Sequence, residues 1–467
     1  MSIDPPHVFT FGGRISRAPY FLIGTLLFAA KHNIDRLIAT SFGFEWSLFN
    51  YWIFDEGGLT NIKGLQRSFL TVLLLVALPF VFIGVALTLR RLRDANLPSW
   101  LVLLFFVPFL NLLFFLLLSV VPSAAFSLKA PKGFRKTLER IIPESELGSA
   151  IAGIVATTVL SLAFAVLATY GLAEYGWGIF VGLPFFLGLN SVLVYGFHRP
   201  RPIGRCLAVS ALAVSFAGLA LFMLAVEGLV CLIMAAPLAF PLSLFGGFIG
   251  FVLQQRDTFA AQSVHVMALT VFLTPSFITA EHAQGPKSPL YEVKTSVVIE
   301  ATPEIVWKNV TNFAELPVPK DLLFRTGIAY PLRAEIQGSG VSAVRHCVFS
   351  TGAFVEPITI WDAPHRLAFD VSAQPPVMEE WSPYTKLSPP HLDHYLVSRR
   401  GEFRLTPLAQ GQTLLEGTTW YENRFWPGKY WQLWSDFIIH RIHSRVLIHI
   451  KALSESAAPH PLSDLPS

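Results

Sequence analysis

Eight segments of roughly 20 mostly apolar residues precede residue 281, and a more polar, strand-rich part follows. A run of about 18 or more apolar residues is long enough to cross a bilayer core of roughly 30 Å. The candidate spans are Tyr20–Thr40, Phe69–Leu89, Trp100–Val121, Ala150–Leu172, Trp177–Phe197, Leu207–Val226, Leu229–Leu253 and Phe259–Ala280. The first is the weakest, because its second half carries Lys31, Asp35 and Arg36. We therefore expect a polytopic α-helical membrane domain with seven or eight true spans.

The composition narrows the class of protein further. Hydrophobic residues make up 53% of the chain and charged residues only 14%, which excludes an ordinary soluble enzyme. The net charge of +4 reflects basic loops that hold a membrane protein in orientation, and no nucleic-acid partner is expected. Three cysteines, with no C-x-x-C pair, are too few for a disulfide framework. No cofactor is expected.

Basic residues between the spans predict the orientation, because such residues favour the cytoplasmic side. If every segment crossed once from an inside N-terminus, the loops Lys129–Arg140 and His198–Arg205 would lie outside, against this rule. If Trp100–Val121 is instead re-entrant and turns near Pro108 and Asn111, all the basic loops lie inside. We favour the second arrangement. It predicts a multi-pass protein of the bacterial inner membrane with a periplasmic C-terminal domain.

Two motifs near the N-terminus resemble a known family. The stretch from Phe11 to Tyr20 reads F-G-G-R-I-S-R-A-P-Y, and the stretch from Arg90 to Asp94 reads R-R-L-R-D, followed by Ser99 and Trp100. Both resemble signatures of domain-of-unknown-function family 805, a family of small bacterial inner-membrane proteins, over residues 8–123. The sequence departs from that family at Arg93, where His is common, and at Pro19, where an acidic residue is usual. The resemblance implies location and fold but no chemistry.

The arginines of these motifs are candidate contacts for lipid phosphates. They are expected at the cytoplasmic ends of helices, where each contact with an anionic surface contributes about 1 kcal/mol. Topological anchoring alone is the alternative interpretation. The five residues are Arg14, Arg17, Arg90, Arg91 and Arg93.

The pattern changes after the linker 285–289. Residues 291–300 alternate as a strand, and Thr302 followed by Pro303 predicts the start of a short helix. Six further strand-like runs and a long helix from Tyr430 to about Leu453 follow. This order predicts an α+β helix-grip domain, in which a curled antiparallel sheet surrounds the last helix. The expected divisions are 8–123, further membrane helices at 124–284, the helix-grip domain at 285–455 and a disordered tail at 456–467.

The start of this domain also resembles a known superfamily. Residues 297–307 read V-V-I-E-A-T-P-E-I-V-W, which is similar to the opening of START-type, polyketide-cyclase-like (SRPBCC) proteins. The resemblance covers residues 290–455. It implies binding of lipids, polyketides or other apolar molecules, and some members of the superfamily are cyclases.

Several side chains are candidates for contacts with such a ligand. Arg345 and Cys347 share one face of a predicted strand, and Glu356 lies on the next strand. Arg345 is expected either to pair with Glu356 or to bind a carboxylate or phosphate with its planar fork. A stripe on the last helix either lines a cavity or is part of a packed core; it consists of Trp431, Trp434, Ile438, Ile442 and Val446. The ligand-binding candidates are Arg345, Cys347, Glu356, Trp420, Trp434 and His440.

Metal and catalytic sites are not expected. Asp436, His440 and His443 follow an i, i+4, i+7 spacing that is more typical of a solvated helix face, and the run His391–His394 lies in a Pro-rich loop. No P-loop, H-E-x-x-H or nucleophile elbow occurs. The sequence favours a non-catalytic, membrane-anchored binding module for a hydrophobic or lipid-like molecule, with membrane lipids as partners. The alternatives are a cyclase or hydrolase using His440, Glu356 or Glu416, and an envelope-sensing interaction protein.

Overall fold

The structure is a computed structural model. It describes residues 11–43, 46, 66–106, 110–121, 123, 132–256, 259–283, 288–313, 315–382, 387, 389–392 and 395–457. The chain divides into two compact units. The helical unit comprises residues 1–168, 177–220 and 236–283. The sheet unit comprises residues 284–467 together with two short segments, 169–176 and 221–235.

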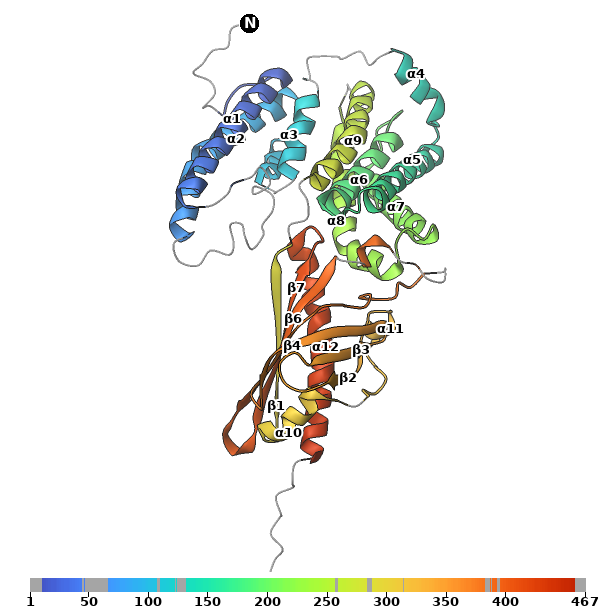
Figure 1. Ribbon diagram of the computed structural model, residues 1–467. Helices are drawn as coiled ribbons and strands as arrows, with labels where there is room; N and C mark the ends of the chain where they lie inside the picture. Colours follow the sequence, from blue (N-terminus) through green and yellow to red (C-terminus); the bar gives the residue numbers. More distant parts are fainter. Residues whose placement is uncertain are drawn as a thin grey trace, which may run out of the picture. The chain divides into compact units, whose positions relative to one another are not determined.

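Long apolar helices build the helical unit (Figure 1). In chain order the elements are α1 (Arg17–Ser41), α2 (Gln66–Asp94), η3 (Ser99–Phe106), α3 (Leu110–Val120), α4 (Lys132–Ile141), α5 (Glu146–Val166), η4 (Leu167–Gly171), η5 (Gly178–Gly182), α6 (Leu183–Tyr195), α7 (Ile203–Met223), α8 (Leu229–Gln254) and α9 (Phe259–His282). Within the described residues, six stretches are long and apolar enough to cross a membrane: Ser68–Asp94, Glu146–Gly171, Gly178–Tyr195, Ile203–Met223, Leu229–Gln254 and Ser263–His282. The protein is a multi-pass membrane protein.

Two of the eight expected segments are not among these six. Tyr20–Thr40 does form a helix, α1, but its second half holds the Lys31–Asp35 ion pair and Arg36, which lower its hydropathy. Trp100–Val121 is not one helix: the short 3-10 helix η3 and the short helix α3 lie on either side of residues 107–109. The described parts of this segment are therefore each too short to span a bilayer alone.

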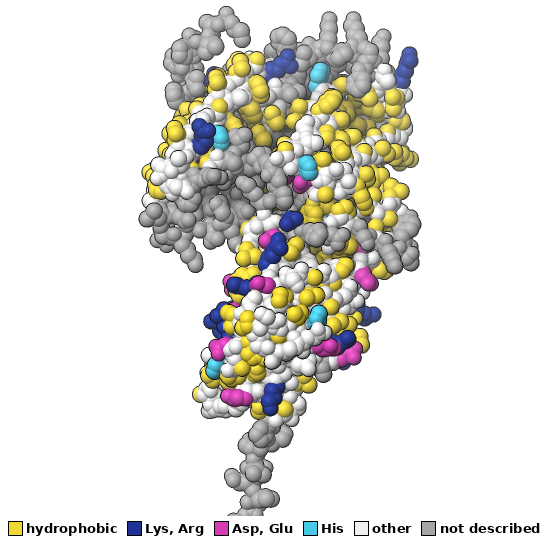
Figure 2. All heavy atoms as spheres, viewed as in Figure 1, with side chains coloured by type: hydrophobic (Ala, Val, Ile, Leu, Met, Phe, Trp, Pro, Cys, Tyr) yellow, Lys and Arg dark blue, Asp and Glu magenta, His cyan; other side chains and the backbone are white. Residues whose placement is uncertain are grey.

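Helix α6 lies at the centre of the helical unit. All thirteen of its residues are buried, whereas α5 exposes an apolar stripe at i, i+4 spacing. That stripe consists of Leu147, Ile151, Val155 and Val159, which are 52–73% exposed. Close approach of α6 and α8 depends on small residues, because a Cβ at Gly188 or Gly246 would clash with the backbone of the other helix. Figure 2 shows hydrophobic side chains over much of the visible surface of this unit, as expected of helices in lipid.

The sheet unit has the helix-grip fold. Seven antiparallel strands follow the order β1-β7-β6-β5-β4-β3-β2, so the first and last strands are neighbours. The strands are β1 (Leu290–Ile299), β2 (Pro331–Gln337), β3 (Val344–Phe349), β4 (Gly352–Asp362), β5 (Arg366–Asp370), β6 (Leu396–Pro407) and β7 (Thr413–Asn423). The helices are α10 (Pro303–Thr311), α11 (Leu322–Arg325) and the 30-residue α12 (Gly428–Ala457), against which the sheet curls (Figure 1).

Local sequence explains how this sheet is covered. Thr302 is the N-cap of α10 and Pro303 its first residue, as predicted, although the Thr302 side chain makes no capping hydrogen bond. Strand alternation and the inner face of α12 then produce one apolar core, which includes Ile299, Val310, Leu415 and Leu447. Two backbone hydrogen bonds connect the short segments to the rest of the sheet unit: Trp426 N to Tyr175 O at 3.1 Å, and Leu229 N to Trp381 O at 3.0 Å.

Candidate functional site

A cavity of about 130 Å³ lies between the inner face of the sheet and α12. Phenylalanine side chains line its sheet side, and aliphatic side chains of α12 line the opposite wall. The apolar lining includes Phe349, Phe354, Phe369, Phe403, Ile439, Ile442 and Val446. The space is mostly apolar, as is usual for sites that hold small organic molecules.

A buried ion pair forms the polar part of the cavity wall. Arg345 on β3 and Glu356 on β4 are directly opposite in the strand register, and Arg345 Nη1 donates to Glu356 Oε2. Their side chains are only 3% and 8% exposed. The guanidinium also lies 5.1 Å from the ring centre of Phe369 and 5.5 Å from that of Phe403. Of the two expected states of Arg345, the structure has the cross-strand ion pair.

One donor of this guanidinium is unused. Arg345 Nε is buried and has no hydrogen-bond partner among the described residues. A buried donor without an acceptor costs about 1–3 kcal/mol, so an acceptor placed in the cavity would recover that free energy. Burial raises the pKa of Glu356, an effect that the neighbouring Arg345 opposes. Burial likewise raises the pKa of Cys347 to about 12, so this thiol stays protonated at neutral pH.

A histidine from α12 completes the polar wall. His443 Nε2 lies 2.8 Å from Thr419 Oγ1, and His443 Nδ1 lies 3.1 Å from Thr295 Oγ1. Burial, and secondarily the nearby His440, lowers the pKa of His443 to about 4. The imidazole is therefore neutral at pH 7 and adds no charge to the cavity.

The structure brings three of the six ligand-binding candidates together. Arg345, Cys347 and Glu356 all line the cavity. Trp420, Trp434 and His440 are not among its lining residues.

The other three candidates have different surroundings. The Trp420 indole donates to Glu292 at 3.0 Å and lies under the Arg400 guanidinium, while His440 is exposed and contacts Thr295 at 2.8 Å. Trp434 is half-buried in α12.

Sequence reasoning missed the phenylalanines of the sheet and the role of His443 and Thr419 in the wall. Alternation in β6 and β7 carried a usable signal, because it places Phe403 and Thr419 on the same inner face as the buried Leu405 and Leu415.

The residues considered for catalysis are not assembled. Glu356 pairs with Arg345 in the cavity, Glu416 pairs with Lys294 at 2.5 Å, and His440 is exposed. The spacing Asp436–His440–His443 gives no metal-ligand group among the described residues. Asp436 accepts a hydrogen bond from Tyr421 at 2.5 Å, and His440 and His443 both contact Thr295 Oγ1, so the expected solvated face is wrong for the half-buried His443. Of the run 391–394, Asp393 and His394 lie outside the described residues.

The N-terminal arginines have different surroundings. Arg91 is fully buried: its Nε donates to Leu118 O at 2.9 Å, its Nη2 to Val121 O and its Nη1 to Asp94 at 2.5 Å. This guanidinium satisfies carbonyls at the end of α3. Arg93 donates to the carbonyls of Phe11 and Gly13. Arg14 is exposed, and Arg17 and Arg90 are half-buried.

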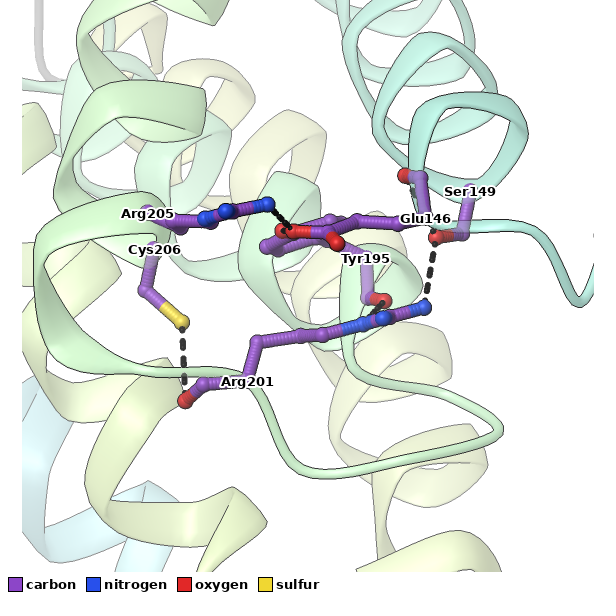
Figure 3. Close-up of polar contacts among 6 residues, drawn as sticks. All are labelled: Glu146, Ser149, Tyr195, Arg201, Arg205 and Cys206. Carbon is purple, nitrogen blue, oxygen red and sulfur yellow. Dashed lines mark hydrogen bonds and ion pairs between the residues drawn. The ribbon is translucent and has the colours of Figure 1, made fainter.

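A second polar cluster lies in the helical unit where α5, α6 and α7 begin or end (Figure 3). Glu146 accepts hydrogen bonds from Tyr195 at 2.8 Å and from Arg205. Arg201 donates to Ser149 at 3.3 Å. One carboxylate faces two guanidinium groups here, so the cluster carries a net positive charge, and its hydrogen bonds connect the ends of these helices.

Two parts of the chain are similar to known proteins. Residues 8–129 match the model of a family described as "Protein of unknown function (DUF805)". No curated protein matches the sequence.

Several solved structures resemble the C-terminal part. Norcoclaurine synthase from Thalictrum flavum is 12% identical to this chain, with a TM-score of 0.26. The matched region includes 37% of this chain and 99% of the synthase chain. The Zhui aromatase/cyclase from Streptomyces sp. R1128 has 14% identity, with 36% and 94% covered and a TM-score of 0.23. A protein from Nitrosospira multiformis has 17% identity, with 35% and 94% covered and a TM-score of 0.21.

Proposed function

We propose that this membrane protein is a non-catalytic binding module, whose helix-grip domain holds one small apolar molecule bearing a neutral hydrogen-bond acceptor. The observation that carries the proposal is the apolar cavity of about 130 Å³ beside the unpartnered, buried Nε–H of Arg345. An engineered apolar cavity of roughly 150 Å³ holds benzene, whereas drug-sized ligands occupy about 300–1,000 Å³. A single ring or a short acyl chain matches the available space.

Charge balance selects the polar group of the ligand. Arg345 and Glu356 already neutralise each other, and His443 is neutral. A ligand carboxylate would add a second buried negative charge, which is costly without a further cation. A ketone, ester or phenol oxygen accepts the free Nε–H and leaves the charge unchanged. The proposal therefore replaces the carboxylate or phosphate expected from the sequence with an uncharged acceptor.

Absence of an activated nucleophile supports binding without catalysis. The Cys347 thiol stays protonated because of its burial, and Glu356 is held by Arg345. The helical unit retains the cavity near a bilayer, in which apolar ligands concentrate. Tethering of this kind raises the effective ligand concentration without new contacts.

Basic loops support placing the C-terminal domain outside an inner membrane. After residue 146 five candidate spans alternate, so the turns at 172–177 and 224–228 share a side with residues 283 onward. The turns 196–202 and 255–262 lie on the other side and contain Arg199, Arg201 and Arg256. Positive residues favour the cytoplasm, which leaves the C-terminal domain in the periplasm.

Cysteine labelling tests the orientation. In a background with the native cysteines replaced, Ala409→Cys and Arg199→Cys each introduce an exposed thiol, one in the β6–β7 turn and one in the 196–202 turn. An impermeant maleimide should label only Ala409→Cys in intact spheroplasts. If only Arg199→Cys is labelled, the proposed orientation is wrong and the C-terminal domain lies in the cytoplasm.

Ligand binding is tested with the full chain in lipid nanodiscs, against empty nanodiscs as the blank. Calorimetric titration should rank acetophenone above toluene and toluene above benzoate. Gly417→Val should weaken acetophenone binding at least tenfold, because a Cβ at this cavity-lining position meets Leu447 and Phe403 at ordinary contact distances of 3.6 and 3.7 Å. Thr406→Val, on an exposed position of β6, is the matched control. Equal acetophenone binding by the wild type and Gly417→Val would show that the ligand does not bind in this cavity.

A further inference from the structure

A group of metal-ligand side chains lies within the sheet unit, away from the cavity lining. It comprises Cys231 in the first turn of α8, Glu380 in the segment after β5, and His391 in the 3-10 helix η6 (Pro390–Leu392). One ligand atom from each residue lies within 4.8 Å of the other two. Cys231 Sγ is 3.1 Å from His391 Nε2, and that nitrogen is 3.5 Å from Glu380 Oε1.

These ligand atoms are buried and incompletely satisfied. The side chain of Glu380 is 0% exposed and that of His391 only 4%. Neither carboxylate oxygen of Glu380 has a hydrogen-bond partner among the described residues. A buried carboxylate needs a hydrogen-bond donor or a cation, because its desolvation is expensive. Within the described part of the chain, the groups nearest to this carboxylate that could donate are His391 Nε2, at 3.5 Å, and the Cys231 thiol. Both are metal ligands themselves, and a metal ion between the three groups would supply the cation.

A second carboxylate is positioned to orient the histidine. Glu227 Oε2 lies 3.4 Å from His391 Nδ1, on the side of the ring opposite to Cys231. Tyr175 donates to the other oxygen of Glu227 at 2.9 Å. At this distance the two groups are neighbours but make no hydrogen bond in the structure. Metal-binding histidines typically donate their remaining N–H to such a carboxylate, which fixes the tautomer that leaves Nε2 free for the metal.

The backbone leaves room for this arrangement. A Cβ at Gly228 would clash with the Glu380 carboxylate, so a residue with a side chain at 228 would displace that ligand. The next residue, Leu229, donates its N–H to Trp381 O at 3.0 Å, which fixes the two segments to each other beside the ligands.

We infer that Cys231, Glu380 and His391 bind a zinc ion, with Glu227 as the positioning residue for His391. Zinc takes thiolate sulfur at about 2.3 Å and imidazole nitrogen at about 2.0 Å, so tetrahedral ligand atoms lie roughly 3.2–3.6 Å apart. The distance of 3.5 Å falls within that range, and the distance of 3.1 Å lies just below it. A thiolate and a carboxylate balance the charge of Zn²⁺, and a mixed sulfur and imidazole set disfavours Mg²⁺ and Ca²⁺. Three protein ligands leave the fourth position for water.

Metal content of the full-length protein tests the inference. The protein is purified in nanodiscs, treated with a chelator, given Zn²⁺ and exchanged into metal-free buffer. Elemental analysis should find one zinc per chain. Cys231→Ser and Glu380→Gln should each weaken zinc binding at least 100-fold, and Glu227→Gln between 10- and 100-fold. Cys347→Ser, which removes a cysteine outside the group, should retain one zinc.

Protection of the Cys231 thiol in the wild-type protein keeps the inference testable if a variant fails to fold, and a spectroscopic comparison with Cys231→Ser adds to it. Zn²⁺ should slow alkylation of Cys231 at least tenfold. The rate of alkylation is measured by peptide mass spectrometry. Co²⁺ should produce a thiolate charge-transfer band that Cys231→Ser lacks. Wild-type protein without bound zinc, or zinc retained equally by Cys231→Ser and Glu380→Gln, overturns the site. Acetophenone binding is measured in a separate experiment, so the zinc site and the proposed ligand cavity can each be disproved without the other.

Discussion

Tyr175 donates a hydrogen bond of 2.9 Å to Glu227, which connects two short segments that are 52 residues apart in the sequence. Each segment lies between apolar helices, and both belong to the sheet unit. The hydroxyl satisfies one oxygen of a carboxylate that is otherwise buried.

Removing that hydroxyl should destabilise the sheet unit. Tyr175→Phe leaves a buried acceptor without its donor, which costs about 1–3 kcal/mol. The denaturant midpoint of the protein should fall accordingly. Tyr170→Phe is the matched control, because the Tyr170 ring is 51% exposed and its hydroxyl contact with Val226 O is 3.4 Å long. An equal loss in both variants would contradict the role of Glu227.

The ion pair in the cavity should show strong coupling between its partners. Arg345→Met alone leaves Glu356 buried and unpaired and should cost about 3–5 kcal/mol of unfolding free energy. Adding Glu356→Leu should recover most of that loss, since replacing both charges by apolar groups is often nearly neutral. The double-mutant cycle is measured by chemical denaturation. Additive losses in the two single variants would show that the pair is not coupled.

Protonation of His443 should make stability depend on pH. The folded pKa of about 4 lies below the ordinary value of 6.5, so the unfolded chain binds more protons between these values. Stability is therefore fully present above pH 6.5 and falls by at most about 3 kcal/mol as the pH drops to 4. His443→Gln keeps hydrogen-bonding atoms near Thr295 and Thr419 but cannot be charged, although His440 remains nearby. Denaturation from pH 7 to 4.5 should show a smaller loss in this variant than in the wild type.

Arg91 should not tolerate lysine. The guanidinium reaches two carbonyls at the end of α3 and also Asp94, which one ammonium group cannot match in geometry. Arg91→Lys should lower the free energy of unfolding by about 1–3 kcal/mol. Arg14→Lys, at an exposed position, is the control in the same thermal unfolding assay. A thermal midpoint for Arg91→Lys that equals the control would contradict the capping role.

Much of the fold could be predicted because each element has a strong local pattern. The alternation in 291–300 and the Thr302–Pro303 start predict β1 and α10, which the structure confirms. The division of Trp100–Val121 into two short helices follows less directly, because an apolar run has no periodicity that distinguishes one long helix from two. Among the described residues six stretches are long and apolar enough to span a membrane, and the expected total of seven or eight stays a prediction.

The cavity was harder to predict than the sheet. Side chains alternate along β7, so Trp420 lies on the opposite face from Leu415 and Thr419, which is the outer face of the sheet. The large size of the Trp420 side chain did not indicate a place in the cavity wall. The stripe expected on the last helix divides in the structure: Trp431 is buried, and Ile442 and Val446 line the cavity, whereas Trp434 and Ile438 are not among the lining residues. Since Ile438 packs in a separate apolar cluster, a single helix has two buried faces.

The group around His391 carries no sequence signal. Cys231 and His391 are 160 positions apart, and no regular spacing relates them to Glu380. Only the fold brings such residues together, so motif searches cannot find them.

Residues 169–176 and 221–235 count among the sheet unit even though each segment includes the end of a candidate transmembrane helix. A fragment expressed from residue 284 onward would lack Tyr175, Glu227, Leu229 and Cys231. It would expose their partners to water: Trp426 for Tyr175, Trp381 for Leu229, and His391 for Glu227 and Cys231. Genetic truncation therefore cannot isolate a complete version of this domain. A soluble protein that keeps all these contacts would need residues 169–176 and 221–235 inserted by design.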